Sequence, residues 1–293
     1  MVGTKGLTLI SKDTFIVVLS DLHSGGSTAL FPNRFWQSTT TEHNHTPTRR
    51  QKQMYKHFVD CMEYARKNRE GKRLIVIHDG DAIEGYHHNT TQVITSNKKE
   101  QAELHIELMD TFLRHTKWSK QDGDQLYYVS GTETHTGDIE HGIAKDLSAE
   151  RNPYGGRIFD RLELKINNRL LWFVHHGKSR GDGANEGNAL RNWLRDVYWD
   201  CAKSRRQPPD FICTGHTHTP AYNTYVIPHE NGYHTIHGLI CPSWQEKTRY
   251  AYKVAPLNKN EIGAVFLEIK GTGEIKTPVI LKKETETYKM VTV

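Results

Sequence analysis

The sequence predicts an α/β fold, and two features of the chain point to it. Four short apolar runs, typical of strands buried on both faces, each end in aspartate or histidine; they cover residues 15–19, 74–77, 171–174 and 211–213. Helix-like and strand-like segments alternate in the early part of the chain, and short strands dominate the late part. Sites in α/β sheets are built where strands end, so these termini are the first place to look for function.

The elements follow one another along a single predicted domain, residues 1–293. In order, we expect a strand at 15–19, a long loop at 24–48, a helix at 48–69, a strand at 74–78, a helix at 98–117, a strand at 126–130, a short helix at 139–150, strands at 161–166 and 170–175, a helix at 188–205, and strands at 211–213, 222–227, 233–240, 263–269 and 275–281. The helices are predicted from apolar residues at helical spacing, and Gly71 ends the first of them. Asn167-Asn168 and Gly271-Thr272-Gly273 are typical of hairpin turns.

Composition limits the class of protein. Hydrophobic residues make up 36% of the 293, enough for a substantial core. No run of ~18 apolar residues is present to span a membrane, and no apolar segment typical of a secretory signal follows Met1. The four cysteines are far apart, which favours reduced thiols in the cytoplasm.

The chain is basic, with a net charge of +5. Nine of the basic residues lie in residues 49–73, against three acidic ones. Such a face suits a polyanionic partner such as nucleic acid, and it is equally typical of an ordinary solvated helix.

The ends of the apolar runs carry groups that bind metals. The pair His216 and His218 follows the turn at Gly215, and comparable positions hold Asp21, His23, Asp81 and His176. Carboxylate and imidazole are the ligands that zinc, manganese and iron share. Asp79, just before Gly80, is either an acceptor for a ligand histidine or a surface group.

These motifs together resemble the calcineurin-like metallophosphoesterases, and more loosely the phage and prophage members of that family. The matching stretches, which span about residues 15–220, are Asp21-x-His23, Gly80-Asp81-x-x-Glu84-Gly85, His176-Gly177 and Gly215-His216-x-His218. The resemblance implies two mixed β-sheets packed as a sandwich and flanked by helices. It also implies two divalent ions, with manganese favoured and iron, zinc, nickel and magnesium as alternatives.

The family's roles can be carried over position by position. Asp21, His23 and His218 would hold the first ion, Asp81 would bridge both ions, and His176 and His216 would hold the second. The family motif places its ligand directly before glycine. This selects His176 and leaves His175 as a structural residue that points to the opposite face of its strand.

One motif departs from the family pattern. Where the family has Gly-Asn-His, this chain has Gly131-Thr132-Glu133-Thr134-His135. Thr132 stands at the asparagine position as a poorer ligand, and Glu133 is a candidate replacement ligand. His135 is either the catalytic acid or an ordinary loop histidine.

The resemblance implies a metal-dependent hydrolase of phosphate esters. We expect a phosphodiesterase acting on a nucleic acid or nucleotide, with His87 and His88 either touching the substrate phosphate or lying on the surface. The alternatives are a phosphomonoesterase and a non-catalytic metal-binding scaffold. The expected location is the cytoplasm of a bacterial or phage-infected host cell.

Overall fold

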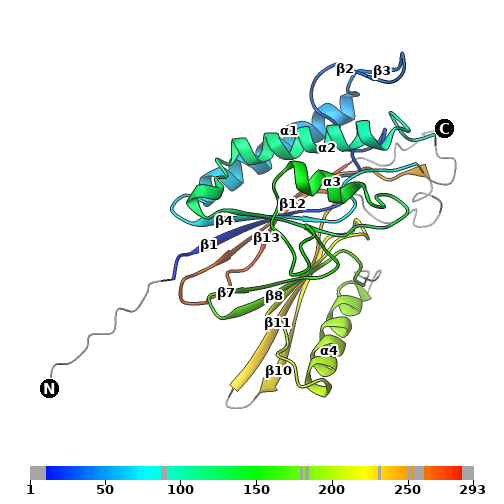
Figure 1. The fold of residues 1–293 in the computed structure, drawn as a ribbon. Coiled ribbons are helices and arrows are strands. Elements are labelled where there is room, and N and C mark those ends of the chain that lie inside the picture. Colours follow the sequence, from blue (N-terminus) through cyan, green and yellow to red (C-terminus); the bar gives the residue numbers. More distant parts are fainter. Residues whose placement is uncertain are drawn as a thin grey trace.

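Two mixed β-sheets form the centre of the computed structural model, which describes residues 11–86, 91–178, 181, 185–229, 232–249, 253 and 261–285 (Figure 1). The six-stranded sheet has the order β13 (Val279–Glu284), β12 (Glu261–Ile269), β1 (Thr14–Leu19), β4 (Arg73–Asp79), β5 (Gln125–Val129), β6 (Ile158–Phe159). The five-stranded sheet has the order β10 (Ala221–His229), β11 (Gly232–Ile240), β9 (Phe211–Thr214), β8 (Arg169–Val174), β7 (Leu162–Ile166).

Both sheets mix parallel and antiparallel pairs. Strands β1, β4, β5 and β6 run parallel, as do β8, β9 and β11, whereas β12, β13, β7 and β10 pair antiparallel with their neighbours. The predicted fold class, two mixed sheets flanked by helices, is therefore confirmed.

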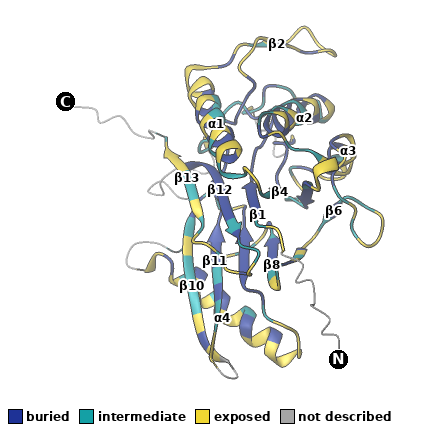
Figure 2. Ribbon diagram, turned by 90° about the vertical axis from the view of Figure 1, so that its left-hand side faces the viewer, coloured by how far each residue is buried: buried dark blue, intermediate teal, exposed yellow. Residues whose placement is uncertain are grey.

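Strand periodicity divides the core into layers. In β1, Phe15 and Val17 belong to the cluster beneath the helices, whereas Ile16 and Val18 belong to the cluster between the two sheets. Alternate side chains of a strand point to opposite faces, so a continuously apolar strand supplies both layers at once. This explains why the central strands are buried along their whole length (Figure 2).

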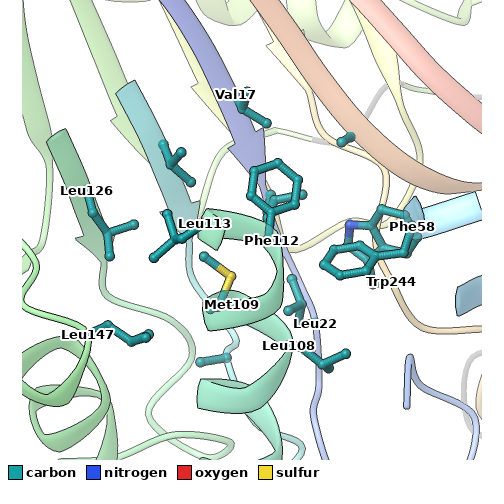
Figure 3. Close-up of a cluster of buried hydrophobic side chains, with 14 of the residues drawn as sticks. Val17, Leu22, Phe58, Leu108, Met109, Phe112, Leu113, Leu126, Leu147 and Trp244 are labelled. Atoms are coloured by element: carbon teal, nitrogen blue, oxygen red, sulfur yellow. The ribbon is translucent and has the colours of Figure 1, made fainter. Parts of the chain in front are cut away.

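Helices cover the outer faces of both sheets. Helices α1 (Arg49–Asn68), α2 (Lys98–His115) and α3 (Ile139–Asp146) lie over the six-stranded sheet, and α4 (Asn188–Lys203) lies against the five-stranded one (Figure 1). In the cluster beneath the first three helices, Phe58 contacts Phe112 and Trp244, with ring centroids 5.7 and 5.1 Å away (Figure 3). No helix among the described residues is long and apolar enough to cross a membrane.

Most predicted elements are present, with four differences, the first of which is the unexpected two-residue strand β6. The loop at 24–48 carries a two-stranded sheet, β2 (Trp36–Gln37) with β3 (Asn44–His45), whose strands are too short to show periodicity. Helix α3 ends at Asp146 rather than at 150, because Ser148 adopts a left-handed backbone with φ 55°. The last strand starts at Val279 rather than at 275; Ile275 makes only an isolated bridge, and Pro278 cannot donate to the ladder.

The basic segment contains several ion pairs within the chain. Arg69 pairs with the buried Asp124 at 2.8 Å, and Lys72 pairs with Glu268 at 3.2 Å. These contacts favour the interpretation of this stretch as a structural helix face.

Candidate metal centre

The carboxyl ends of parallel strands from both sheets meet at one place. Asp21 and His23 follow β1, Asp81 follows β4, Thr132 and His135 follow β5, His175 and His176 follow β8, and His216 and His218 follow β9. Two contacts join the sheets here: the His216 amide donates to Asp21 Oδ2 at 3.1 Å, and His175 Nδ1 donates to the Asp79 carbonyl at 2.7 Å.

Five of these residues have a left-handed backbone. The φ angles are 53° at Asp21, 45° at His23, 53° at Asp81, 67° at His216 and 54° at His218. Aspartate, asparagine and histidine tolerate this region better than most residues, and strained backbone of this kind is concentrated at functional sites. The sharp turn after each strand aims the side chain across the end of the sandwich.

The candidate ligands form overlapping clusters rather than one group. Their ligand atoms lie within 4.8 Å of one another in the sets Asp21/His23/His218, His23/Asp81/His135, Asp21/Asp81/His175 and His175/His176/His216. Asp21, Asp81 and His175 therefore connect a histidine group on one side with a histidine group on the other. Clustered carboxylates and imidazoles are a donor set that fits divalent transition metals.

His23 is oriented by a buried carboxylate. Its Nδ1 lies 3.0 Å from Glu84 Oε2, and Gln245 also donates to this carboxylate. A carboxylate partner at Nδ1 fixes the tautomer and leaves Nε2 free to bind a metal. Burial alone would lower the pKa of His23, but Glu84, Asp81 and Asp21 together raise it to about 9.

The prediction that His175 points away from the centre is wrong. Leu171 and Phe173 face the core between the sheets, and His175 continues that face to the point where the strands of the other sheet end. Its Nε2 lies 3.0 Å from Asp81 Oδ2 and 3.9 Å from Asp21 Oδ1, and the side chain is buried. Because Nδ1 donates to the Asp79 carbonyl, Nε2 is the atom directed at both carboxylates.

The second histidine group is more open. His176 and His216 are exposed, and their ring centroids lie 4.4 Å apart. Thr132 lies beside them: its Oγ1 is 3.2 Å from Asp81 Oδ2 and 3.4 Å from His216 Nδ1. Its amide also donates to Asp81 Oδ1 at 2.6 Å. Thr132 thus contacts both Asp81 and His216.

The remaining predicted residues divide into three cases. His135 reaches the centre, where its ring lies 4.8 Å from that of His23 and its Nδ1 lies 2.7 Å from the Glu84 carbonyl. Glu133 is exposed and belongs to none of the ligand clusters found among the described residues. His87 and His88 lie outside the described residues.

Glu140 also supports the centre, although nothing in the sequence indicates it. This α3 residue is buried, and its carboxylate accepts from the Ala82 amide at 3.2 Å and from the Gly131 amide at 3.0 Å. It therefore joins the loop that carries Asp81 to the loop that carries Thr132. Helical apolar spacing cannot reveal such a residue, because its role depends on where α3 packs.

In the centre, burial and neighbouring charges shift the pKa values of the carboxyls and of His175 in opposite directions. Burial would raise the pKa of Asp21 and Asp81, but neighbouring histidines hold the pKa of both carboxyls well below the usual range: His218 and His175 act on Asp21, and chiefly His175 acts on Asp81. Burial would lower the pKa of His175, yet Asp21, Asp81 and Asp79 raise it to about 10. Burial lowers the pKa of His135, His176 and His216, so these rings remain neutral near pH 7. Neutral imidazole is the form that binds metal ions.

Comparisons with known proteins yield only distant structural likenesses. The sequence matches no protein-family model and no curated protein. Solved structures that are similar include a predicted phosphoesterase from Streptococcus pneumoniae, a Thermotoga maritima protein and a metallophosphoesterase from Sphaerobacter thermophilus. Their identities are 10%, 14% and 10%, and their TM-scores 0.31, 0.32 and 0.32. The alignments cover 93%, 93% and 94% of this chain and 98%, 99% and 89% of those chains. Likenesses at these TM-scores say nothing about the function of this chain.

Proposed function

We propose that this protein is a metal-dependent hydrolase of phosphate esters, with a phosphodiester as the favoured substrate. The observation that carries the proposal is the continuous series of overlapping ligand clusters, linked through Asp21, Asp81 and His175. One cluster of three ligands would suffice for a single ion, whereas a series on both sides of shared carboxylates suits two. The motifs that resemble metallophosphoesterases support the same function.

The residues present fit two divalent ions, and manganese is the favoured metal. Asp21, His23 and His218 would hold one ion, His176 and His216 the other, with His175 as a further ligand and Asp81 between them. Thr132 takes the asparagine position as a weaker oxygen donor. Two ions at such a site would neutralise phosphate charge and would lower the pKa of a bound water toward the neutral range.

The chain's own side chains would orient the substrate and move its protons. His135 donates its Nδ1 proton to the Glu84 carbonyl, which leaves Nε2 to exchange a proton with the leaving-group oxygen. Burial lowers the pKa of His135, and an anionic phosphate beside it would raise that pKa again. His135 is therefore proposed as the general acid.

The net charge of +5 favours an anionic polymer or nucleotide as the substrate. A phosphomonoester is the alternative within the same chemistry. The replacement of asparagine by Thr132 favours a different candidate, a metal-binding scaffold without turnover.

The test compares hydrolysis of bis-p-nitrophenyl phosphate and p-nitrophenyl phosphate by the manganese-loaded protein. Asp81→Asn removes the shared carboxylate charge, and we expect it to lower diester turnover by at least about 100-fold. Asp138→Asn is the matched control. Asp138 is exposed, precedes α3 and makes no side-chain capping bond, so this variant should retain full activity.

The two substrates separate the candidates. Diester turnover that depends on Asp81 supports the proposal, and faster monoester turnover would support a phosphomonoesterase. If the metal-loaded protein hydrolyses neither ester nor any nucleic acid, the protein is a metal-binding scaffold and the proposed enzymatic function is wrong.

A further inference from the structure

Beneath the metal centre lies a second cluster of potential ligands, which contains sulfur. Asp79 is the last residue of β4, Cys213 lies in β9, and Cys241 directly follows β11. Their exposed fractions are 0%, 0% and 1%. The two Sγ atoms are 3.3 Å apart, and a carboxylate oxygen of Asp79 lies within 4.8 Å of both.

The carboxylate of Asp79 has an unusual environment. Neither of its oxygens has a hydrogen-bond partner among the described residues, although both are fully buried. It continues the face of β4 on which Ile75 and Ile77 pack between the sheets. Burying a charged carboxylate without a partner is strongly unfavourable, so such a group requires a cation or a proton. The alternative that Asp79 is a surface group is wrong, because the residue is fully buried.

This cluster is distinct from the centre above it. Asp81 faces the histidines, whereas the Asp79 side chain faces the two thiols, and the two sets share no ligand. The Asp79 backbone joins them: its carbonyl accepts from His175 Nδ1 at 2.7 Å and from Ser20 Oγ at 2.8 Å. Ser20 Oγ in turn contacts Asp21 Oδ2 at 2.5 Å.

We propose that Asp79, Cys213 and Cys241 form a separate site for a thiophilic divalent cation, with zinc as the representative ion. Two zinc–sulfur bonds of ~2.3 Å can span the observed sulfur separation, and one carboxylate oxygen completes three protein ligands. Binding converts both thiols to thiolates and releases their two protons to solvent, together with the proton that the Asp79 carboxyl holds in the metal-free protein. A water molecule takes the fourth position.

Rigid elements hold all three ligands. Cys213 lies within the parallel ladders that join β9 to β8 and β11, and the Cys241 amide donates to the Thr214 carbonyl at 2.7 Å. The site thus ties one sheet to the other directly below the residues that hold the catalytic ions. Its expected role is structural, because the three groups are closed to substrate.

Cobalt provides a test that distinguishes the two sites. The metal-free protein is titrated with Co²⁺, and the near-ultraviolet charge-transfer absorption of thiolate bound to cobalt is recorded. The ligands of the centre above are only nitrogen and oxygen, so this absorption reports the sulfur site alone. We expect it in the native protein and not in Cys213→Ser or Cys241→Ser. Zinc content measured on the same variants should fall by one ion per chain.

Cys201→Ser is the matched control, because Cys201 is equally buried but lies on the inner face of α4, in a different cluster. This variant should retain the charge-transfer absorption and the full zinc content. The proposal is overturned if the native protein binds cobalt at the centre without any thiolate absorption. It is also overturned if thiol titration of the denatured native protein shows a Cys213–Cys241 disulfide. Both decisive measurements use the native chain, so they hold even where a variant fails to fold, and neither depends on hydrolytic activity.

Discussion

Two adjacent histidines occupy different environments at the end of β8. His175 is buried against Asp81 and Asp21 with its tautomer fixed by the Asp79 carbonyl, whereas His176 is exposed beside His216. A ligand held in advance by packing loses little freedom when the ion binds.

Asparagine at each position tests this difference. Even partners outside the ligand shell change metal affinity about 10–100-fold, so we expect His175→Asn to weaken manganese binding by about 100-fold or more. His176→Asn should weaken it by less than about 10-fold, since the remaining buried ligands stay in place. Isothermal titration calorimetry of the metal-free variants with manganese measures both affinities.

His141→Asn serves as the control, because His141 is exposed on α3 and should leave the affinity unchanged. Equal losses at His175 and His176 would contradict the unequal roles that their burial indicates.

For single residues, the sequence shows which residue types follow each strand, but not the direction in which their side chains point. The spacing of Asp21, His23, His216 and His218 shows that ligands follow strands, and the structure brings them together, while their ligand roles stay predictions. The choice between His175 and His176 depends on the face that β8 presents at its last residue, which the sequence does not reveal. Cys213 and Cys241 are 28 residues apart and meet only because β9 and β11 pair.

A buried glutamate fixes the turn between β2 and β3 to helix α2. Glu100 is 2% exposed and accepts from Ser38 Oγ at 2.6 Å, the Thr39 amide at 2.9 Å and Thr95 Oγ1 at 2.6 Å. Burial would raise the pKa of Glu100, but these hydrogen bonds, with that of Thr40, lower it from the ordinary 4.5 to about 2.

This depressed pKa makes stability depend on pH. The contribution of the ionised carboxylate is fully present above pH 4.5 and is lost as pH falls through about 2. Glu100→Gln should therefore lower the free energy of unfolding by about 1.5–3 kcal/mol at pH 7, and the difference should shrink toward pH 2. Urea unfolding across this range measures it. Glu103→Gln, on the exposed side of the same helix, should change little, and a loss at Glu100 that is independent of pH would contradict the argument.

Helix α4 packs closely on β11 at a glycine. A Cβ at Gly238 would lie 2.7 Å from both terminal methyl carbons of Leu194, which is fully buried. Gly238→Ala should therefore destabilise the fold by about 1–3 kcal/mol, as overpacking of cores generally does. Gly142→Ala is the matched change: it has open space in an exposed part of α3 and should stabilise by about 0.5–1 kcal/mol. Thermal unfolding of both variants shows whether each change stabilises or destabilises the fold. Equal effects would contradict the close packing of α4 on β11.

Elements were predicted where apolar periodicity was long enough to measure. Strand β1 and helix α1 begin within one residue of their predicted starts, and Asn167 and Asn168 both adopt positive φ, as a two-residue hairpin turn requires. Strands β2, β3 and β6 were missed because each has only two residues. Periodicity also gives no information on how the two sheets face each other.

The candidate metal centre lies between two sheets, and no strand of one sheet pairs with a strand of the other among the described residues. In the proposed centre, bound ions would contact residues after β1 and β4 on one side and after β8 and β9 on the other, so they would bind the folded chain and not the unfolded one. At a free manganese concentration of 100 times Kd, binding stabilises the fold by about 2.7 kcal/mol. For a chain of this size, that corresponds to a rise in Tm of about 4 °C.

Differential scanning calorimetry with manganese and with excess chelator measures this shift. Asp81→Asn should reduce it, whereas Asp138→Asn should not. A native Tm that is the same under both conditions would contradict a metal centre that joins the sheets. The prediction of one domain over residues 1–293 stays a prediction.

The left-handed backbone at five candidate ligands also limits how this protein can change by mutation. Branched residues such as valine, isoleucine and threonine are strained at φ near 50°, whereas asparagine, aspartate and glycine are tolerated. Mutations that abolish metal binding but preserve the fold are therefore restricted to a few residue types. Among descendants that had lost the metals, Asp21, His23, Asp81, His216 and His218 would be replaced mainly by asparagine or glycine, so an inactive lineage would still carry a recognisable record of the lost centre.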